Sequence, residues 1–462
     1  MRTTPSQDGP RQEAGELALQ AAAVLRKNDM GGWTRAAPTL YPHQWSWDSA
    51  FIAIGLAHVD TRRAAAEIRS LLNHQWKNGK VPHIVFNPAA PPDSYFPGPE
   101  HWASAAPDAP DASSHPAMTS GLCQPPVHAI AARRILEVAE SRNEGIEDAR
   151  RFLRDVYAKL FAWHRYLATN RDRENSGLVT IFHPWESGTD NSPRWFEALG
   201  RVEVGEGLSY ERLDLKHVKD PSERPVQDTY DRFIWLVELI KRTGCDDSAI
   251  YTTSPFLVKD VLFSAILVRA NEALLEIAEI VEAPYGDRDT IRAWIQRGHG
   301  GLDERWDPEL ELCLDYDLRA GCSLGTRTIA GLSPLFSGSG PAARRKSLLE
   351  TLDSPFFAGD PDLRWPLPPS TSPGEPRFHP RSYWRGPVWP VLNWLLCWSL
   401  ERSGEAERAG TLRRASLEQL ADGRFGEYYE PFTGEPLGSD GQSWTAAVAL
   451  DWLANEEALE TP

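Results

Sequence analysis

Apolar residues recur at helical spacing along most of the chain. Within residues 148–170, Phe152, Val156 and Leu160 follow one another at four-residue intervals, as on one face of an amphipathic helix. The same spacing predicts helices over residues 15–28, 46–59, 61–76, 125–141, 148–170, 228–244, 256–281, 286–298, 322–332, 341–352, 386–404, 406–423 and 440–458. Strand-like alternation is rare, and its best candidates are 178–182 and 311–318. The chain is therefore predicted to be all-α.

Long loops rich in Pro, Gly and Trp interrupt the helices at 79–120, 182–227 and 353–386. Loops of this length in a compact domain are usually functional. Helix pairs joined by alternately short and long loops suggest a closed α/α toroid whose long loops form a pocket at one rim. An open helical solenoid is the alternative, although no repeat of fixed period is visible. No linker divides the chain, so we predict a flexible N-terminus (1–14) and one domain (15–458).

The net charge and the cysteine content indicate which binding partners and which cellular compartment to expect. The net charge of −16 argues against binding to nucleic acid or to an anionic membrane. The five cysteines are odd in number and form no C-x-x-C pair, which is typical of a reducing compartment and not of a zinc site. The first residues resemble no signal peptide, and no apolar run is long enough to cross a membrane. We expect a cytoplasmic protein, and a homo-oligomer stays open.

Several common catalytic motifs are missing from the sequence. It contains no phosphate-binding loop, no H-E-x-x-H and no G-x-S-x-G, so metal and serine-nucleophile chemistry have no support. What it does contain is 18 tryptophans, many of them beside prolines, glycines and acids. Such aromatic side chains stack on the apolar faces of sugar rings, although a bulky core would also explain them.

Two loops place carboxylates among aromatic residues. The first, FHPWESGTDNSP (182–193), contains Glu186 and Asp190. A carboxyl partly shielded from water by aromatic rings has a raised pKa and can act as a general acid, although Asp190 could instead cap the following turn. The second loop (423–444) contains Glu427, which has no evident capping role. Acid-catalysed cleavage of a glycoside needs two carboxyls facing each other across the bond.

Six motifs together resemble a known enzyme family. They lie at 41–48 (YPHQWSWD), 75–83 (QWKNGKVPH), 119–126 (TSGLCQPP), 183–191 (HPWESGTDN), 383–389 (YWRGPVW) and 427–434 (EYYEPFTG). In this order they are similar to glycoside hydrolase family 63, and most of all to its small glucosylglycerate and mannosylglycerate hydrolases. The resemblance runs from about residue 40 to 455 and implies an (α/α)6 barrel. Larger members carry an additional β-rich domain for which this chain has no room, which favours a compact, exo-acting enzyme.

The resemblance also implies roles for individual residues. Asp190 matches the general acid and Glu427 the general base of an inverting enzyme, whose two carboxyls lie roughly 6.5–9.5 Å apart. The implied substrate-binding residues are Tyr41, Trp47, Asp48, His83, Gln124, Trp185, Glu186, Tyr383, Trp384 and Trp389. Of these, Asp48 is expected to accept a sugar hydroxyl, and His83 is expected to be a structural residue in a pocket motif. No metal or organic cofactor is required by such a mechanism.

Arg224 and Tyr230 match the positions that hold glycerate in the small hydrolases of the family. The match agrees with general chemistry, because a carboxylate is bound well by a planar, bidentate guanidinium and by hydroxyl donors. The alternative is that Arg224 is an ordinary surface charge.

The function implied is hydrolysis of glucosylglycerate, or secondly of mannosylglycerate, to a hexose and D-glycerate. A trehalase-like or other small-substrate α-glucosidase is the alternative within the same class. A sugar epimerase or isomerase and a non-catalytic sugar-binding barrel are more distant alternatives. We further hypothesise that loops 79–120 and 200–225 close over the substrate.

Overall fold

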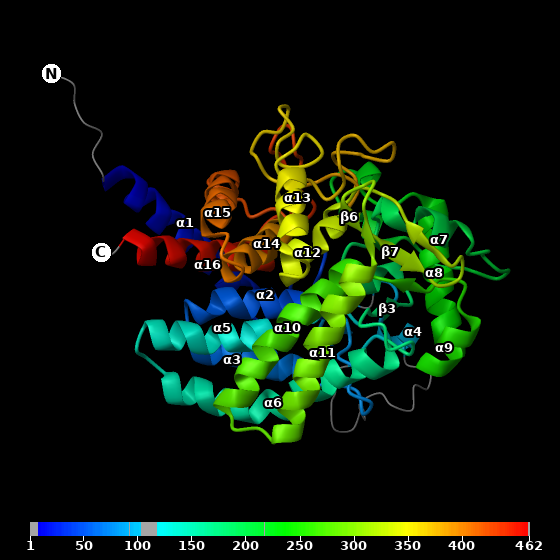
Figure 1. Cartoon of the computed structure of the whole chain (residues 1–462), viewed down its shortest axis with the longest axis horizontal. Helices are drawn as coiled ribbons and strands as arrows, with labels where there is room; N and C mark the ends of the chain where they lie inside the picture. The colour runs from blue at the N-terminus through cyan, green and yellow to red at the C-terminus, as the bar shows by residue number, and fades with distance from the viewer. Residues whose placement is uncertain (1–7, 92, 103–117, 217, 461–462) are drawn as a thin grey trace.

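The computed structural model describes residues 8–91, 93–102, 118–216 and 218–460. The fold is mostly helical, and its strands are two or three residues long and lie in the connecting segments (Figure 1). The coarse prediction of a helical protein is therefore confirmed.

Six helices follow one another in a closed order of packing. They are α2 (Ser46–Ala57), α5 (His128–Ser141), α10 (Val261–Ile280), α12 (Ser333–Ser337), α14 (Pro390–Arg402) and α16 (Ser443–Glu460). Each packs against the next, and α16 packs in turn against α2. Helix α2 is buried on all sides, as expected for a helix that is apolar all round. These six helices are called the inner ring below.

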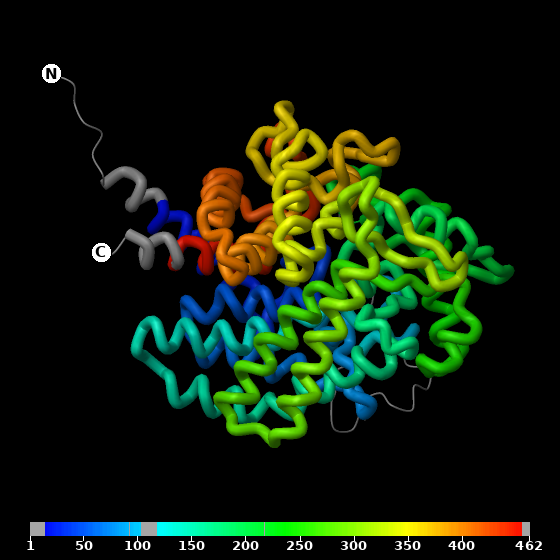
Figure 2. The backbone as a smooth tube through the Cα atoms, in the orientation of Figure 1, coloured from blue at the N-terminus to red at the C-terminus, as the bar shows by residue number. Residues whose placement is uncertain are grey.

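A second set of helices covers the inner ring from outside. It consists of α1 (Asp8–Asn28), α3 (Thr61–Leu72), α6 (Ile146–Asn170), α11 (Tyr285–Glu304), α13 (Ala342–Leu352) and α15 (Ala406–Leu420). Each of these helices packs on one or two inner helices, and outer and inner helices alternate along the chain. Figure 2 follows the path of the chain through them from blue to red. Helix α3 illustrates the pattern, because its buried side chains, which include Ile68 and Leu71, lie on one face.

The ring closes where α2 meets α16, and the backbones come close there. A Cβ atom on Gly55 of α2 would lie 2.3 Å from the Cα of Ala447 on α16. The absence of a side chain at Gly55 and the small side chain at Ala447 therefore set the spacing of the first and last inner helices.

Short elements outside the ring hold the loops together. The remaining helices are α4 (Pro99–Trp102), α7 (Phe196–Gly200), α8 (Gln227–Arg242) and α9 (Asp247–Thr253). The strands are β1 (Gln44–Trp45), β2 (Ile84–Val85), β3 (Thr180–Ile181), β4 (Val258–Lys259), β5 (Trp306–Asp307), β6 (Leu312–Cys313), β7 (Asp315–Asp317), β8 (Cys322–Leu324), β9 (Tyr428–Tyr429) and β10 (Pro436–Leu437). Strands β3, β4, β7 and β8 form one antiparallel sheet, and the other strands pair as β1–β2, β5–β6 and β9–β10.

Several predicted boundaries need correction. The expected helix at 322–332 is wrong, because Cys322–Leu324 pairs with β7 and only Ile329–Leu332 makes a helical turn. The helix expected from 256 begins at Val261, because residues 258–259 join the sheet and Asp260 caps the helix by accepting from the amides of Leu262 and Phe263. The first helix begins at Asp8 and not at 15.

No helix among the described residues is long and apolar enough to cross a membrane.

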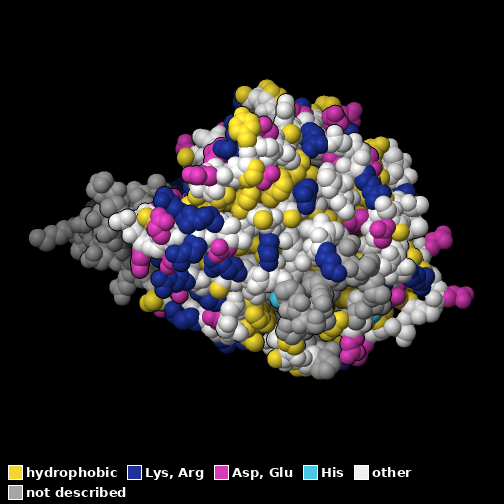
Figure 3. Space-filling view, turned by 90° about the horizontal axis from the view of Figure 1, so that it is seen from below, with side chains coloured by type: hydrophobic (Ala, Val, Ile, Leu, Met, Phe, Trp, Pro, Cys, Tyr) yellow, Lys and Arg dark blue, Asp and Glu magenta, His cyan; other side chains and the backbone are white. Residues whose placement is uncertain are grey.

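The face seen from below mixes acidic and basic side chains (Figure 3). Part of the long loop predicted at 79–120 lies outside the described residues, namely 92 and 103–117, as does residue 217 of the loop at 200–225.

Candidate active site

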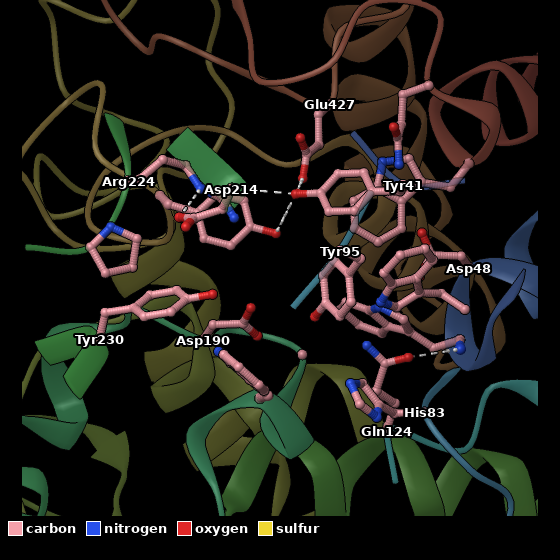
Figure 4. A pocket seen from close by; sticks show the side chains of 18 residues that line it. Tyr41, Asp48, His83, Tyr95, Gln124, Asp190, Asp214, Arg224, Tyr230 and Glu427 are labelled. Atoms are coloured by element: carbon pink, nitrogen blue, oxygen red, sulfur yellow. Dashed lines mark hydrogen bonds and ion pairs between the residues drawn. The ribbon is translucent and has the colours of Figure 1, made fainter. Parts of the chain in front are cut away.

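One pocket gathers residues from loops and from the first turns of helices that are far apart in the sequence (Figure 4). Its lining residues are Tyr41, Trp45, Trp47, Asp48, His83, Tyr95, Gln124, Trp185, Gly188, Asp190, Asp214, Arg224, Pro225, Tyr230, Tyr383, Glu427, Gln442 and Trp444. Eleven of the fourteen residues proposed from the sequence are among them. The three that are not are Glu186, Trp384 and Trp389.

Glu427 is fixed at one side of the pocket. It is 1% exposed, and its position directly before β9 holds its backbone. Its Oε1 accepts hydrogen bonds from the hydroxyls of Tyr41 (2.9 Å) and Tyr383 (3.1 Å), and its Oε2 accepts from the amide of Ser439 (3.2 Å). The pKa of Glu427 is raised above its ordinary value, because burial outweighs the lowering by the charge of Arg224 and by these hydrogen bonds. Donors on both oxygens favour the ionised form, which is the form that a base needs.

Asp190 lies across the pocket from Glu427 (Figure 4). It follows the 3-10 turn Pro184–Ser187 in the loop 182–193. Burial raises the pKa of Asp190 to about 7, the charge of Glu427 adds to the rise, and Arg224 opposes it. A carboxyl in this state holds its proton near neutral pH and can donate it, whereas Glu427 is arranged to accept one.

Trp47 and Asp48 form the adjacent wall. They lie in the first turn of α2, and the backbone amide of Trp47 donates to Oε1 of Gln124 (3.4 Å). Gly188, with φ +71°, packs against Trp47, and a Cβ there would lie 2.7 Å from the Trp47 ring. Burial and the charges of Glu427 and Asp190 raise the pKa of Asp48 well above its ordinary value.

Glu186 does not line the pocket, which corrects its expected contact with the sugar. Both of its oxygens are held by Arg171 at 2.7 Å, and they also accept from the amides of Phe182 and Cys123. A carboxylate with four donors has no free side for a ligand. Glu186 instead fixes the turn that carries Trp185 into the pocket.

Trp384 and Trp389 also lie behind the pocket surface and not on it. Their rings stack at 3.6 Å between centroids and 1° between planes. The Trp389 ring meets Tyr383 edge-on at 5.2 Å, and Trp384 lies 6.5 Å from Trp47. The two tryptophans therefore support two lining aromatic residues from behind.

Arg224 carries a positive charge into the pocket. It follows the 3-10 turn Pro221–Glu223, its Nη1 donates to the hydroxyl of Tyr41 (3.3 Å), and its guanidinium lies 4.4 Å from the Tyr383 ring centre. Its Nε lies 3.5 Å from Oδ2 of Asp214. The alternative of an ordinary surface charge does not fit, because the side chain is only 10% exposed. Tyr230, on the first turns of α8, lines the same pocket.

His83 lines the pocket as a neutral side chain. Burial lowers its pKa to about 3, and its Nδ1 is hydrogen-bonded to the hydroxyl of Ser120. No group of three or more His, Cys, Asp or Glu within the described parts of the chain is arranged to hold a metal ion.

Seven lining residues were not proposed from the sequence. They are Trp45, Tyr95, Gly188, Asp214, Pro225, Gln442 and Trp444. Trp45 and Gly188 lie inside quoted motifs, and Gln442 and Trp444 lie inside the loop 423–444, so their place in these segments was the available signal. Tyr95 and Asp214 belong to loops without a motif, and no pattern in the sequence indicates them.

The comparison with known proteins identifies the family. A family model described as the mannosylglycerate hydrolase MGH1-like glycoside hydrolase domain matches residues 41–445. The chain belongs to this glycoside hydrolase family. The resemblance predicted from the six motifs is thus confirmed, and the protein is a glycoside hydrolase.

Relatives within the family align over nearly the whole chain. The hydrolase is 49% identical to a protein of Mycolicibacterium hassiacum named glucosylglycerate hydrolase, over 95% of this chain and 98% of that one. It is 42% identical to a protein of Thermus thermophilus named mannosylglycerate hydrolase, over 94% and 100%. A crystal structure described as a GH63 mannosylglycerate hydrolase from Thermus thermophilus, in complex with Tris and D-glycerate, superposes with a TM-score of 0.86 at 41% identity, covering 94% of this chain and 99% of that chain.

Proposed function

We propose that the protein is an inverting, exo-acting α-glycoside hydrolase that cleaves glucosylglycerate, and secondly mannosylglycerate, into a hexose and D-glycerate. The observation that carries this proposal is the placement of Arg224 in the same pocket as the two carboxyls Asp190 and Glu427. A guanidinium beside the carboxyl pair can bind a carboxylate on the leaving group. The names of the relatives agree with such a substrate, and the higher identity is to the one named glucosylglycerate hydrolase.

In the proposed reaction, the carboxyl of Asp190 gives its proton to the glycosidic oxygen while the bond to the anomeric carbon breaks. Glu427 takes a proton from a water molecule, whose oxygen bonds to the anomeric carbon from the opposite face and inverts it. Asp190 ends ionised and Glu427 protonated, and both exchange protons with solvent. Tyr41 and Tyr383, which donate to Oε1 of Glu427, orient the base.

We propose Trp47, Asp48, Gln124 and Trp185 as the sugar-binding wall and Arg224 with Tyr230 as the glycerate side. The closed order of six inner helices, each with an outer helix, supports an (α/α)6 barrel. We also keep a cytoplasmic location in the proposal, since all five cysteines are free thiols and four of them are buried. Closure of the loops at 79–120 and 200–225 stays a prediction.

The test is to incubate the purified protein with glucosylglycerate, mannosylglycerate, glucosylglycerol and trehalose and to follow the released hexose by NMR. We expect only the two glycerates to be cleaved, with the β-anomer of the hexose appearing first. The Asp190→Asn variant, prepared in parallel, excludes a contaminating hydrolase if it is inactive. Cleavage of glucosylglycerol or trehalose at a similar rate would mean that the carboxylate is not recognised, and a trehalase-like α-glucosidase would replace the proposal.

A further inference from the structure

A second acid lies beside the arginine of the pocket. The carboxylate of Asp214, in the 3-10 turn Leu213–Lys216, lines the pocket and is 7% exposed. Arg212 binds both of its oxygens, through Nε to Oδ1 (2.7 Å) and through Nη2 to Oδ2 (2.8 Å). Arg224 approaches the same carboxylate, with its Nε 3.5 Å from Oδ2. One aspartate is thus shared by two guanidinium groups, of which only Arg224 lines the pocket.

Arg212 is engaged through its Nε and Nη2 atoms in this arrangement. In addition to its two bonds to Asp214, its Nη2 donates to the backbone oxygen of Pro225 (3.1 Å), and its guanidinium lies 3.8 Å from the ring centre of Tyr230. Its charge is therefore used inside the protein and is not offered to a ligand. Although burial alone would raise the pKa of Asp214, the hydrogen bonds from Arg212 and the charge of Arg224 hold it below its ordinary value, so Asp214 is ionised at neutral pH.

The formal charges around this end of the pocket then balance. Arg212 and Arg224 contribute two positive charges, and Asp214 and Glu427 contribute two negative ones. A ligand with one carboxylate can use Arg224, which is the one lysine or arginine among the lining residues that the structure describes. A second anionic group on the ligand finds no further lysine or arginine in the described part of the lining, and it lies near the carboxylates of Asp214 and Glu427. Like charges that are partly shielded from water repel strongly.

We propose that Asp214 is a specificity-determining residue that restricts the leaving group to a single negative charge. It does so by engaging Arg212 and by adding its own charge to the pocket wall. The inference rests on the proposed function, because it concerns the subsite assigned there to glycerate. It assigns the enzyme to glycosides of monocarboxylic hydroxy acids and excludes glycosides of dicarboxylic or phosphorylated ones.

The inference can be tested by calorimetry with two free acids and the full-length protein at pH 7. D-Glycerate carries one charge, and hydroxymalonate, in which a carboxylate replaces the hydroxymethyl group, carries two at similar size. The wild-type protein is expected to bind D-glycerate at least about tenfold more tightly than hydroxymalonate. In Asp214→Asn this ratio should fall by about tenfold or more, because Arg212 is released and a negative charge is removed. Asp214→Glu, which keeps the charge, should retain the discrimination.

Asp228→Asn is the matched control, since it removes the same charge from a residue that is 74% exposed and lies outside the pocket lining. Its ratio should equal that of the wild type. Equal binding of the two acids by the wild-type protein overturns the inference without any variant, so it stays testable if Asp214→Asn does not fold. An unchanged ratio in a folded Asp214→Asn also overturns it.

The same experiments separate the two proposals. Hydrolysis of glucosylglycerate together with equal binding of both acids removes the role of Asp214 and leaves the proposed function. Absence of both hydrolysis and D-glycerate binding removes both proposals.

Discussion

Replacing Asp190 by asparagine should abolish hydrolysis and yet stabilise the fold, increasingly so at higher pH. The pKa of Asp190 is raised by burial from an ordinary ~3.9 to about 7. The folded protein therefore holds a proton that the unfolded chain releases, and stability falls as pH rises through this interval. Asparagine keeps the shape of the side chain and removes this dependence.

The magnitude follows from the two pKa values. Their difference corresponds to a loss of at most ~4 kcal/mol in the free energy of unfolding. About 2.5 kcal/mol of this loss occurs between pH 5 and pH 8. An unfolding entropy of roughly 2 cal/mol/K per residue converts this part into ~2–3 °C for a chain of this length. The advantage of Asp190→Asn in melting temperature should therefore be about 2–3 °C greater at pH 8 than at pH 5.

The assay is thermal unfolding of the wild type and the variant at both pH values, with hydrolysis measured on the same preparations. Asp228→Asn serves as the control, because this exposed residue should show no such pH-dependent gain. An advantage that is equal at pH 5 and pH 8 would refute the assignment of a raised pKa to Asp190. An Asp190→Asn variant that is less stable than the wild type at pH 8 would refute it as well.

Three further predictions test the rest of the site. Above pH 7, kcat/KM should fall about tenfold per pH unit as Asp190 loses its proton, and a profile that is flat to pH 9 would contradict its role as the acid. Glu427→Gln should lower kcat by about a hundredfold or more with little change in KM, and kinetics that lose less than tenfold would argue for another base. Gly188→Ala should lower kcat/KM, because the new methyl would lie 2.7 Å from the Trp47 ring. Gly207→Ala, at φ +83° with no heavy atom within 4 Å, separates this clash from backbone strain, and equal losses in the two variants would show that strain alone acts.

Outer helices such as α3 could be predicted because their burial is periodic. In α3 the apolar positions recur every three to four residues, and the structure buries that face. The segment at 322–332 fails for the opposite reason. Its strand is three residues long and is held by pairing with Asp315–Asp317, a partner that local spacing cannot indicate.

The site could be predicted where a motif marked it. The sequence does not distinguish a residue that lines the pocket from one that holds a lining residue in place. Glu186 and Asp190 lie in one loop, yet Arg171 occupies both oxygens of the former and leaves the latter facing the pocket. That difference depends on an arginine fifteen residues earlier in the chain. Asp214 could not be found at all, because its role arises only when Arg212 and Arg224 meet around it.

The close contact of Gly55 with Ala447 bears on the distance between the two carboxyls of the proposed reaction. The loop with Asp190 lies between α6 and α7, and the loop with Glu427 lies between α15 and α16. The two carboxyls thus come from separate loops, and in the proposed mechanism the space for a water molecule between them depends on how the ring holds these loops apart. Gly55 and Ala447 set one of the six spacings that make up the circumference of the ring. A methyl group added at Gly55 is therefore expected to change the separation of the carboxyls of Asp190 and Glu427, although Gly55 and Ala447 lie in neither of the two loops.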